Sequence, residues 1–179
     1  MVIGAGAIGA FVLAGLRHLG VRDVVAVDFP GRRLDRAARL GARSVVPPSD
    51  TLVPDVLAVL DGRAPDVVVE ASGARGQLAT ALRMVADGGR VLAVGIPKER
   101  PSLDIRSMVF REVTLDTTLA HVCDTDLPAA LGVLADGTIG AEFVEPPVGL
   151  DELGASLERL ASGLVEGKVL IDPRGGTSC

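Results

Sequence analysis

Short apolar runs rich in β-branched residues alternate with longer segments of helical periodicity along most of the chain. The runs expected to form strands are 2–3, 24–27, 44–46, 67–70, 91–94 and 113–117. The segments expected to form helices between them are 8–19, 32–40, 54–60 and 76–85. Buried parallel strands are apolar on both faces and are joined by helical crossovers. The pattern therefore predicts an α/β fold, a doubly wound parallel sheet of about six strands.

The two ends of the chain are less regular. Parallel strands usually have about five or six residues, yet only three residues precede the first glycine, Gly4, so we expect a truncated first strand. Either the chain is a fragment, or the strand starts elsewhere, or another segment completes it. Beyond residue 120, Asp126 with Pro128 is expected to cap a helix to about 135, and Asp151 a helix to about 161. A last short strand is expected at 167–171.

Composition narrows the class of protein. The chain has 179 residues, 48% of them hydrophobic, which fits one globular domain rather than a disordered protein. The net charge of −5 and an aromatic content of 2% argue against nucleic acid as a partner. Two cysteines cannot build a disulfide framework, and the uncharged stretch 1–16 is shorter than the ~20 residues of a membrane span. We expect a cytoplasmic protein that binds no membrane.

A glycine-rich motif follows the first strand and precedes the first helix. The segment Gly4-Ala5-Gly6-Ala7-Ile8-Gly9 fits G-x-G-x-x-G. In this motif the first glycine permits a tight turn, the second lets the backbone approach a pyrophosphate, and the third lets helix and strand pack closely. The helix N-terminus presents free N–H groups to the phosphates. We expect a Rossmann fold that binds a dinucleotide through Gly4, Gly6, Ala7, Ile8 and Gly9.

An acidic residue at the end of the second strand supports this interpretation. Asp28 lies nineteen residues after Gly9, close to the ~20 expected for a carboxylate that binds the adenosine ribose hydroxyls. Asp28 would repel a 2′-phosphate, which favours NAD over NADP, although Arg32 and Arg33 could accommodate that phosphate. The alternatives are a flexible glycine turn with a solvated strand end, or a methyltransferase-like nucleotide fold.

These motifs resemble the zinc-type medium-chain alcohol and polyol dehydrogenases, most strongly the sorbitol, butanediol and threonine dehydrogenase-like branch. The resemblance covers roughly 2–172. The segments that carry it, in the family's order, are 2–9, 25–28, 33–34, 40–42, 66–73, 88–91, 94–96, 110–115 and 167–169.

The resemblance implies roles for further residues. It implies that Asp28 and Arg33 hold the adenosine ribose and that Ser72 and Gly73 lie beside the nicotinamide ribose. The backbone groups that it implies hold the carboxamide are those of Val94, Gly95, Ile96 and 114–116. It also implies a homodimer through the edge strand near Val113, with the apolar run 108–110 on a covered edge.

The resemblance also implies a catalytic zinc in an N-terminal GroES-like domain, which we expect to be absent. The expected organisation is a dinucleotide-binding domain at 1–145, a segment at 146–172 that returns to the catalytic domain, and a disordered tail at 173–179. The function implied is the NAD-binding part of a dehydrogenase that transfers hydride between a secondary alcohol or polyol and nicotinamide, inactive as this chain alone. The alternative is a noncatalytic NAD-binding or dimerising module.

Other reactive residues do not form a convincing catalytic or metal site. His18 lies late on the first expected helix and His121 follows the sixth expected strand, so these two lie far apart in the expected fold. No third or fourth ligand stands at a useful spacing from them or from Cys123, so we expect no metal ligands and no catalytic residue in this chain. Glu70 and Asp28 could suggest a carboxylate pair for acid–base chemistry, but adjacent strand ends that bind one cofactor explain them better.

Overall fold

The computed structural model of the protein describes residues 1–119, 122–135, 137–162, 164–165 and 167–174. Six strands form one parallel sheet in the order β3-β2-β1-β4-β5-β6. The strands are β1 (Val2–Ile3), β2 (Val25–Val27), β3 (Ser44–Val46), β4 (Val67–Glu70), β5 (Arg90–Ala93) and β6 (Thr114–Thr117). The strand order reverses between β1 and β4, so the prediction of a doubly wound sheet is confirmed.

The short first strand lies in the middle of this sheet. Val2 is in register with Ala26 of β2 on one side and with Val69 of β4 on the other, and it is fully buried. The predicted truncation of this strand is confirmed, since β1 has two residues. The end of β1 therefore lies where the strand order reverses. In doubly wound folds, ligands bind in the crevice at this point.

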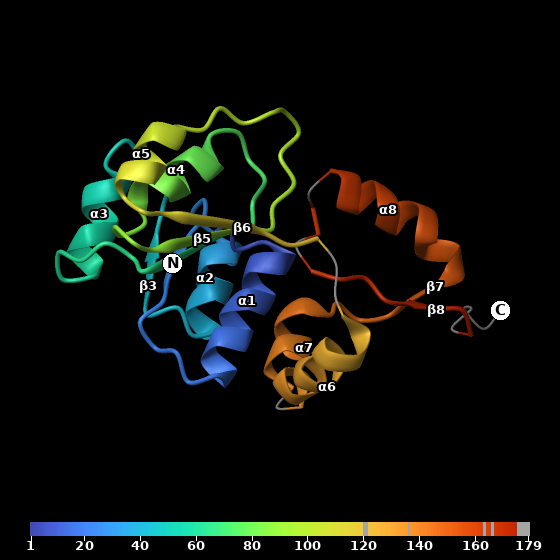
Figure 1. Ribbon diagram of the computed structural model, residues 1–179. Helices are drawn as coiled ribbons and strands as arrows, with labels where there is room; N and C mark the ends of the chain where they lie inside the picture. The colour runs from blue at the N-terminus through green and yellow to red at the C-terminus, as the bar shows by residue number, and fades with distance from the viewer. Residues whose placement is uncertain (120–121, 136, 163, 166, 175–179) are drawn as a thin grey trace. The chain divides into compact units, whose positions relative to one another are not determined.

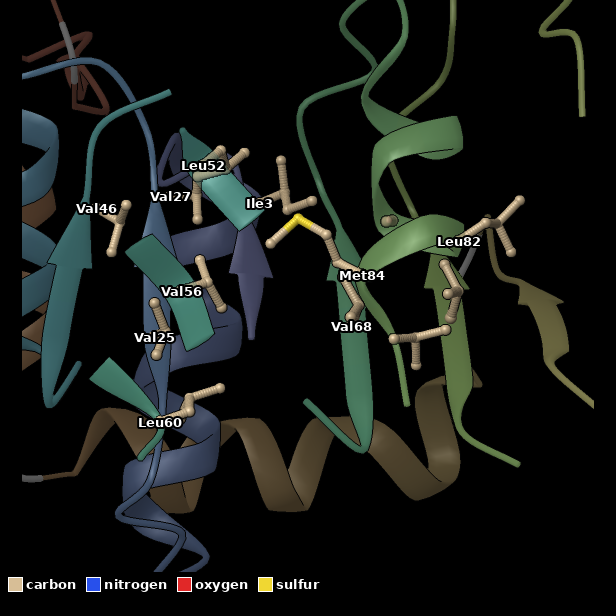
Figure 2. Packing of buried hydrophobic residues seen from close by; sticks show 13 residues of the cluster. Ile3, Val25, Val27, Val46, Leu52, Val56, Leu60, Val68, Leu82 and Met84 are labelled. Carbon is tan, nitrogen blue, oxygen red and sulfur yellow. The ribbon is translucent and has the colours of Figure 1, made fainter. Parts of the chain in front are cut away.

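Helices cover both faces of the sheet. On one face lie α1 (Ala7–His18) and α2 (Arg32–Arg39), and on the other lie α3 (Leu52–Val59), α4 (Gln77–Met84) and α5 (Ile105–Phe110), as Figure 1 shows. One large apolar cluster joins α3 and α4 to the sheet. Within it, Met84 of α4 points toward Ile3 of β1 (Figure 2). This packing holds β1 in place within the sheet and so positions the loop that follows it.

The chain divides into two compact units, 1–133 and 134–179. The boundary expected at 145 lies inside the second unit. That unit contains α7 (Thr138–Phe143), which the sequence pattern did not predict, a turn at Leu150–Glu152, and α8 (Leu153–Ala161). It also holds a small parallel pair, β7 (Val148–Gly149) with β8 (Ile171–Asp172).

Two predicted helix starts are wrong. Helix α6 spans Cys123–Leu134, so Asp126 and Pro128 lie inside it. The Asp126 carboxylate instead reaches back to accept a hydrogen bond from Val122 N at 2.7 Å. At the other site, Glu152 rather than Asp151 accepts from Gly149 N, at 3.2 Å. In both places the carboxylate that accepts from a free amide at the helix start belongs to a residue three or four positions after that amide, not to the N-cap residue itself.

The last predicted strand is also displaced. Within 167–171, Lys168 forms a single bridge with Val144, and the paired segment β8 begins only at Ile171. Residues 173–174 form a turn, and the rest of the expected tail lies outside the described residues. No helix in the described part of the chain is long and apolar enough to span a membrane.

Candidate cofactor site

The glycine-rich loop between β1 and α1 is shaped by close backbone contacts. Gly4 has a φ of +90°, and a Cβ there would lie 2.8 Å from both N and Cβ of Ser72. A Cβ on Gly9 would overlap the carbonyl oxygen of Gly4 and lie 2.9 Å from its carbon. Gly6 differs, because a Cβ there would meet no atom within 4 Å. The protein's own packing therefore demands Gly4 and Gly9, whereas the space in front of Gly6 is open.

The start of α1 adjoins this open space. Helix geometry leaves the amides of Ala7, Ile8 and Gly9 without acceptors inside the helix, and the first turn contains no acidic residue. Gly6 at the N-cap position offers no side-chain cap. The partial positive charge at the N-terminus of this twelve-residue helix is thus carried by backbone amides that no side chain caps. The arrangement suits an anionic group of the size of a phosphate.

Asp28 follows β2 and binds the backbone of the glycine-rich loop. Its buried carboxylate accepts a hydrogen bond from Ala5 N through Oδ2, and another from Phe29 N through Oδ1, both at 2.7 Å. Arg33 Nη1 lies 3.9 Å from Oδ1. The two residues predicted for the adenosine ribose are therefore adjacent, and Asp28 also orients the loop.

Sequence reasoning missed Arg36, which supports the same loop. This arginine of α2 is 5% exposed, and its Nη2 donates to the carbonyl oxygen of Ala5 at 3.3 Å. Ala5 is therefore held at its amide by Asp28 and at its carbonyl by Arg36. A signal was available, because Arg36 lies one helical turn before the buried Leu40.

A second cluster lies at the ends of β4 and β5. The side chain of Glu70 is buried, and its Oε1 accepts hydrogen bonds from Ser72 N at 2.8 Å, from Ser72 Oγ, and from Gly73 N at 3.1 Å. The Glu70 carbonyl accepts from the amides of Val94 and Gly95, both at 2.9 Å. The residues that the resemblance places near nicotinamide are thus tied to one glutamate.

A cavity of about 700 Å³ opens beside this cluster. Its lining includes Glu70, Ser72, Gly73, Gly95 and Ile96, whereas Val94 does not line it. The outer part is formed by the start of α4 and the loop after β5, with exposed charged side chains. Of the residues predicted for the nicotinamide side, the structure therefore brings Ser72, Gly73, Gly95 and Ile96 together at one cavity.

The role expected for the backbone of 114–116 at the carboxamide stays a prediction, and the register of β6 gives the position of these residues. The register of β6 places Thr114, Leu115 and Asp116 level with Arg90–Leu92 of β5, so they lie before the strand ends rather than beside Val94. The apolar run 108–110 is not part of the edge strand, since it forms the end of α5, with Val109 and Phe110 exposed. β6 itself is an edge strand, as predicted.

Two of the remaining candidate residues, His18 and Cys123, lie on different helices. His18 ends α1 and Cys123 begins α6, where it is exposed. His121 lies outside the described residues. Across the described ranges, no group of three or more histidine, cysteine, aspartate or glutamate side chains could hold a metal ion. The absence of metal ligands from the whole chain stays a prediction.

A doubly wound sheet with a glycine-rich loop after β1 and an acidic residue after β2 is typical of dinucleotide-binding domains. Residues 7–136 match the family model described as zinc-binding dehydrogenase, and the chain belongs to this family. The family consists of oxidoreductases, so the methyltransferase alternative falls away.

Known proteins resemble the chain over almost all of its length. The L-threonine 3-dehydrogenase of Marinomonas sp. (strain MWYL1) is 28% identical over 173 residues, which are 96% of this chain and 50% of that protein. The crystal structure of 2R,3R-butanediol dehydrogenase from Bacillus subtilis has a TM-score of 0.85 at 25% identity, with 97% of this chain and 50% of that chain covered.

A third similar protein, an alcohol dehydrogenase of Escherichia coli CFT073 crystallised with NADH, has a TM-score of 0.82 at 19% identity. The match covers 95% of this chain and 50% of that one. The chain spans about half the length of the relatives that it matches.

Proposed function

We propose that this chain binds NAD and forms the nucleotide-binding part of an alcohol or polyol dehydrogenase. The observation that carries the proposal is the contrast within the glycine-rich loop. Packing explains Gly4 and Gly9, but no protein atom lies where a side chain at Gly6 would stand. A bound pyrophosphate accounts for Gly6, because it would occupy this space and accept from the amides of α1.

The rest of the cofactor follows from the two neighbouring strand ends. Asp28 would accept from the adenosine ribose hydroxyls with the lone pairs that its two backbone bonds leave free. A 2′-phosphate would bring further negative charge to this buried carboxylate, which favours NAD over NADP. On the other side of β1, Ser72, Gly73 and the end of β5 would form the wall for the nicotinamide half.

The proposed reaction is hydride transfer between nicotinamide and the carbinol carbon of a secondary alcohol or polyol. Bound NAD⁺ supplies the hydride acceptor. The described residues hold no ligand set for zinc, so we derive no step through a metal from this chain. We propose that the 179 residues alone bind the cofactor without oxidising alcohols.

Self-association is a separate part of the proposal. β6 ends the strand order, and no strand of the described ranges pairs with its outer side. The neighbouring end of α5 exposes Val109 and Phe110. Unpaired edges and exposed apolar residues are features that dimer contacts cover. We propose a homodimer through this edge.

Binding of NADH and NADPH to the wild-type chain and to Asp28→Asn tests the cofactor assignment. The substitution keeps the shape of the side chain but removes its charge. We expect NADH affinity to fall about tenfold, as for a lost hydrogen bond to a charged group, while NADPH affinity stays or rises. Asp151→Asn, the same change at an exposed position of the second unit, should alter neither affinity. Unchanged affinities in Asp28→Asn would reject the assignment of Asp28.

A further inference from the structure

The carboxylate of Glu70 holds the loop after β4, which borders the candidate cofactor site. It is 2% exposed and sits at the end of β4, in register with Ile3 on one side and Ala93 on the other. Its oxygens accept from the amides of Ser72 and Gly73, the latter at 3.1 and 3.2 Å. The Ser72 hydroxyl donates to it as well.

The glycines around Glu70 show how tightly this arrangement is built. A Cβ on Gly95 would lie 2.7 Å from Glu70 Oε2, and a Cβ on Gly73 would lie 2.5 Å from the carbonyl oxygen of Ile96. Gly4 in turn packs against Ser72. The phosphate loop and the end of β5 therefore both lie in close contact with the loop that the Glu70 carboxylate holds, at Ser72 and Gly73 respectively.

The negative charge of Glu70 has no cationic partner in the described part of the chain. All of its hydrogen-bond donors are neutral amides and a hydroxyl, and it takes part in no ion pair there. Arg75, Lys98 and Arg100 line the outer part of the same cavity, but their side chains are exposed, so solvent screens them. A buried charge that lines a cavity acts on what enters the cavity much more strongly than an exposed one.

We propose that Glu70 is a positioning residue whose charge favours the oxidised form of the cofactor over the reduced form. The inference rests on the proposed function, which puts nicotinamide at the wall formed by Ser72, Gly73 and the end of β5. The oxidised ring carries a positive charge and the reduced ring is neutral. The hydrogen bonds of Glu70 set the geometry of the wall for both forms, whereas its charge attracts only the oxidised one.

The two effects separate in Glu70→Gln, which keeps the size of the side chain and removes the charge. We expect the ratio of NAD⁺ affinity to NADH affinity to fall on the order of tenfold. Both dissociation constants would be measured by calorimetry on the full chain, with thermal unfolding as a check of folding. Glu158→Gln makes the same change at an exposed position of the second unit and should leave the ratio as it is.

Glu70→Asp serves as the second variant, because it keeps the charge and shortens the reach to Ser72 and Gly73. We expect both affinities to fall while their ratio stays at the wild-type value. An unchanged ratio in Glu70→Gln, or a ratio that falls in Glu70→Asp, would overturn the inference while the proposed function stands. Failure of the wild-type chain to bind either form would instead overturn the proposed function itself.

Discussion

Substitutions at Gly6 and Gly9 by alanine should separate a ligand's requirement for glycine from the protein's own. A methyl group at Gly9 would overlap the carbonyl oxygen of Gly4, so α1 or the loop must shift. Misplaced volume of this kind costs about 1–3 kcal/mol or more. At Gly6 the φ of −63° suits alanine and no atom lies within 4 Å of the added group. The poorer N-cap and the stiffer unfolded chain roughly cancel, so stability should change by less than about 1 kcal/mol.

The affinity for NADH should depend on Gly6 even though the stability of the fold does not. In Gly6→Ala the methyl group would stand where the proposed pyrophosphate lies, and we expect NADH affinity to fall at least about tenfold in a chain of nearly wild-type stability. Gly15→Ala is the matched control, since Gly15 lies within the same helix in open space. It should gain about 1 kcal/mol and bind NADH normally.

Urea unfolding followed by circular dichroism gives the stabilities. NADH fluorescence gives the affinities without protein background, because the chain contains no Trp or Tyr. The reasoning is refuted if Gly6→Ala binds NADH as the wild type does, or if its stability falls as far as that of Gly9→Ala.

Two further predictions concern charged side chains outside the loop. Arg111 is 25% exposed, donates to the carbonyl oxygens of Leu82 at 2.8 Å and Val85 at the end of α4, and pairs with Asp87 at 2.6 Å. Arg111→Met should cost about 2 kcal/mol in urea unfolding, and a loss below about 0.5 kcal/mol would contradict this role. The hydrogen bond and charge of Arg43 lower the pKa of Asp23, so this pair stabilises the fold at neutral pH and the contribution disappears as pH falls through that lowered pKa. Arg43→Met should raise the pKa of Asp23 toward its ordinary value in a carboxyl NMR titration, and an unchanged value would show that Arg43 does not act on it.

The central sheet was predictable because buried parallel strands leave a simple pattern. Continuous apolar runs marked the six strands to within one residue at every end, since both faces of such a strand avoid water. The glycine-rich loop and Asp28 were also readable, because a tight turn and a strand-end carboxylate need particular residue types at particular spacings.

Predictions from a single local signal failed more often. Asp126 and Asp151 both suit an N-cap, yet neither is the cap in the structure. The segment 167–171 is apolar enough for a strand, but its pairing partner β7 reaches only Ile171 and beyond.

The sequence by itself thus determined the six strands of the sheet, the helices that join the first five of them, and the loop that is fit for a phosphate, because periodicity and glycine spacing are local properties. The tertiary structure decided what meets at that loop. It brought Arg36 beneath Ala5 and set Glu70 between the loop after β4 and Gly95. It also divided the glycines into those that packing requires and Gly6, which it does not. These facts depend on the distance between neighbouring strand ends, and that distance is set by the packing of the whole sheet.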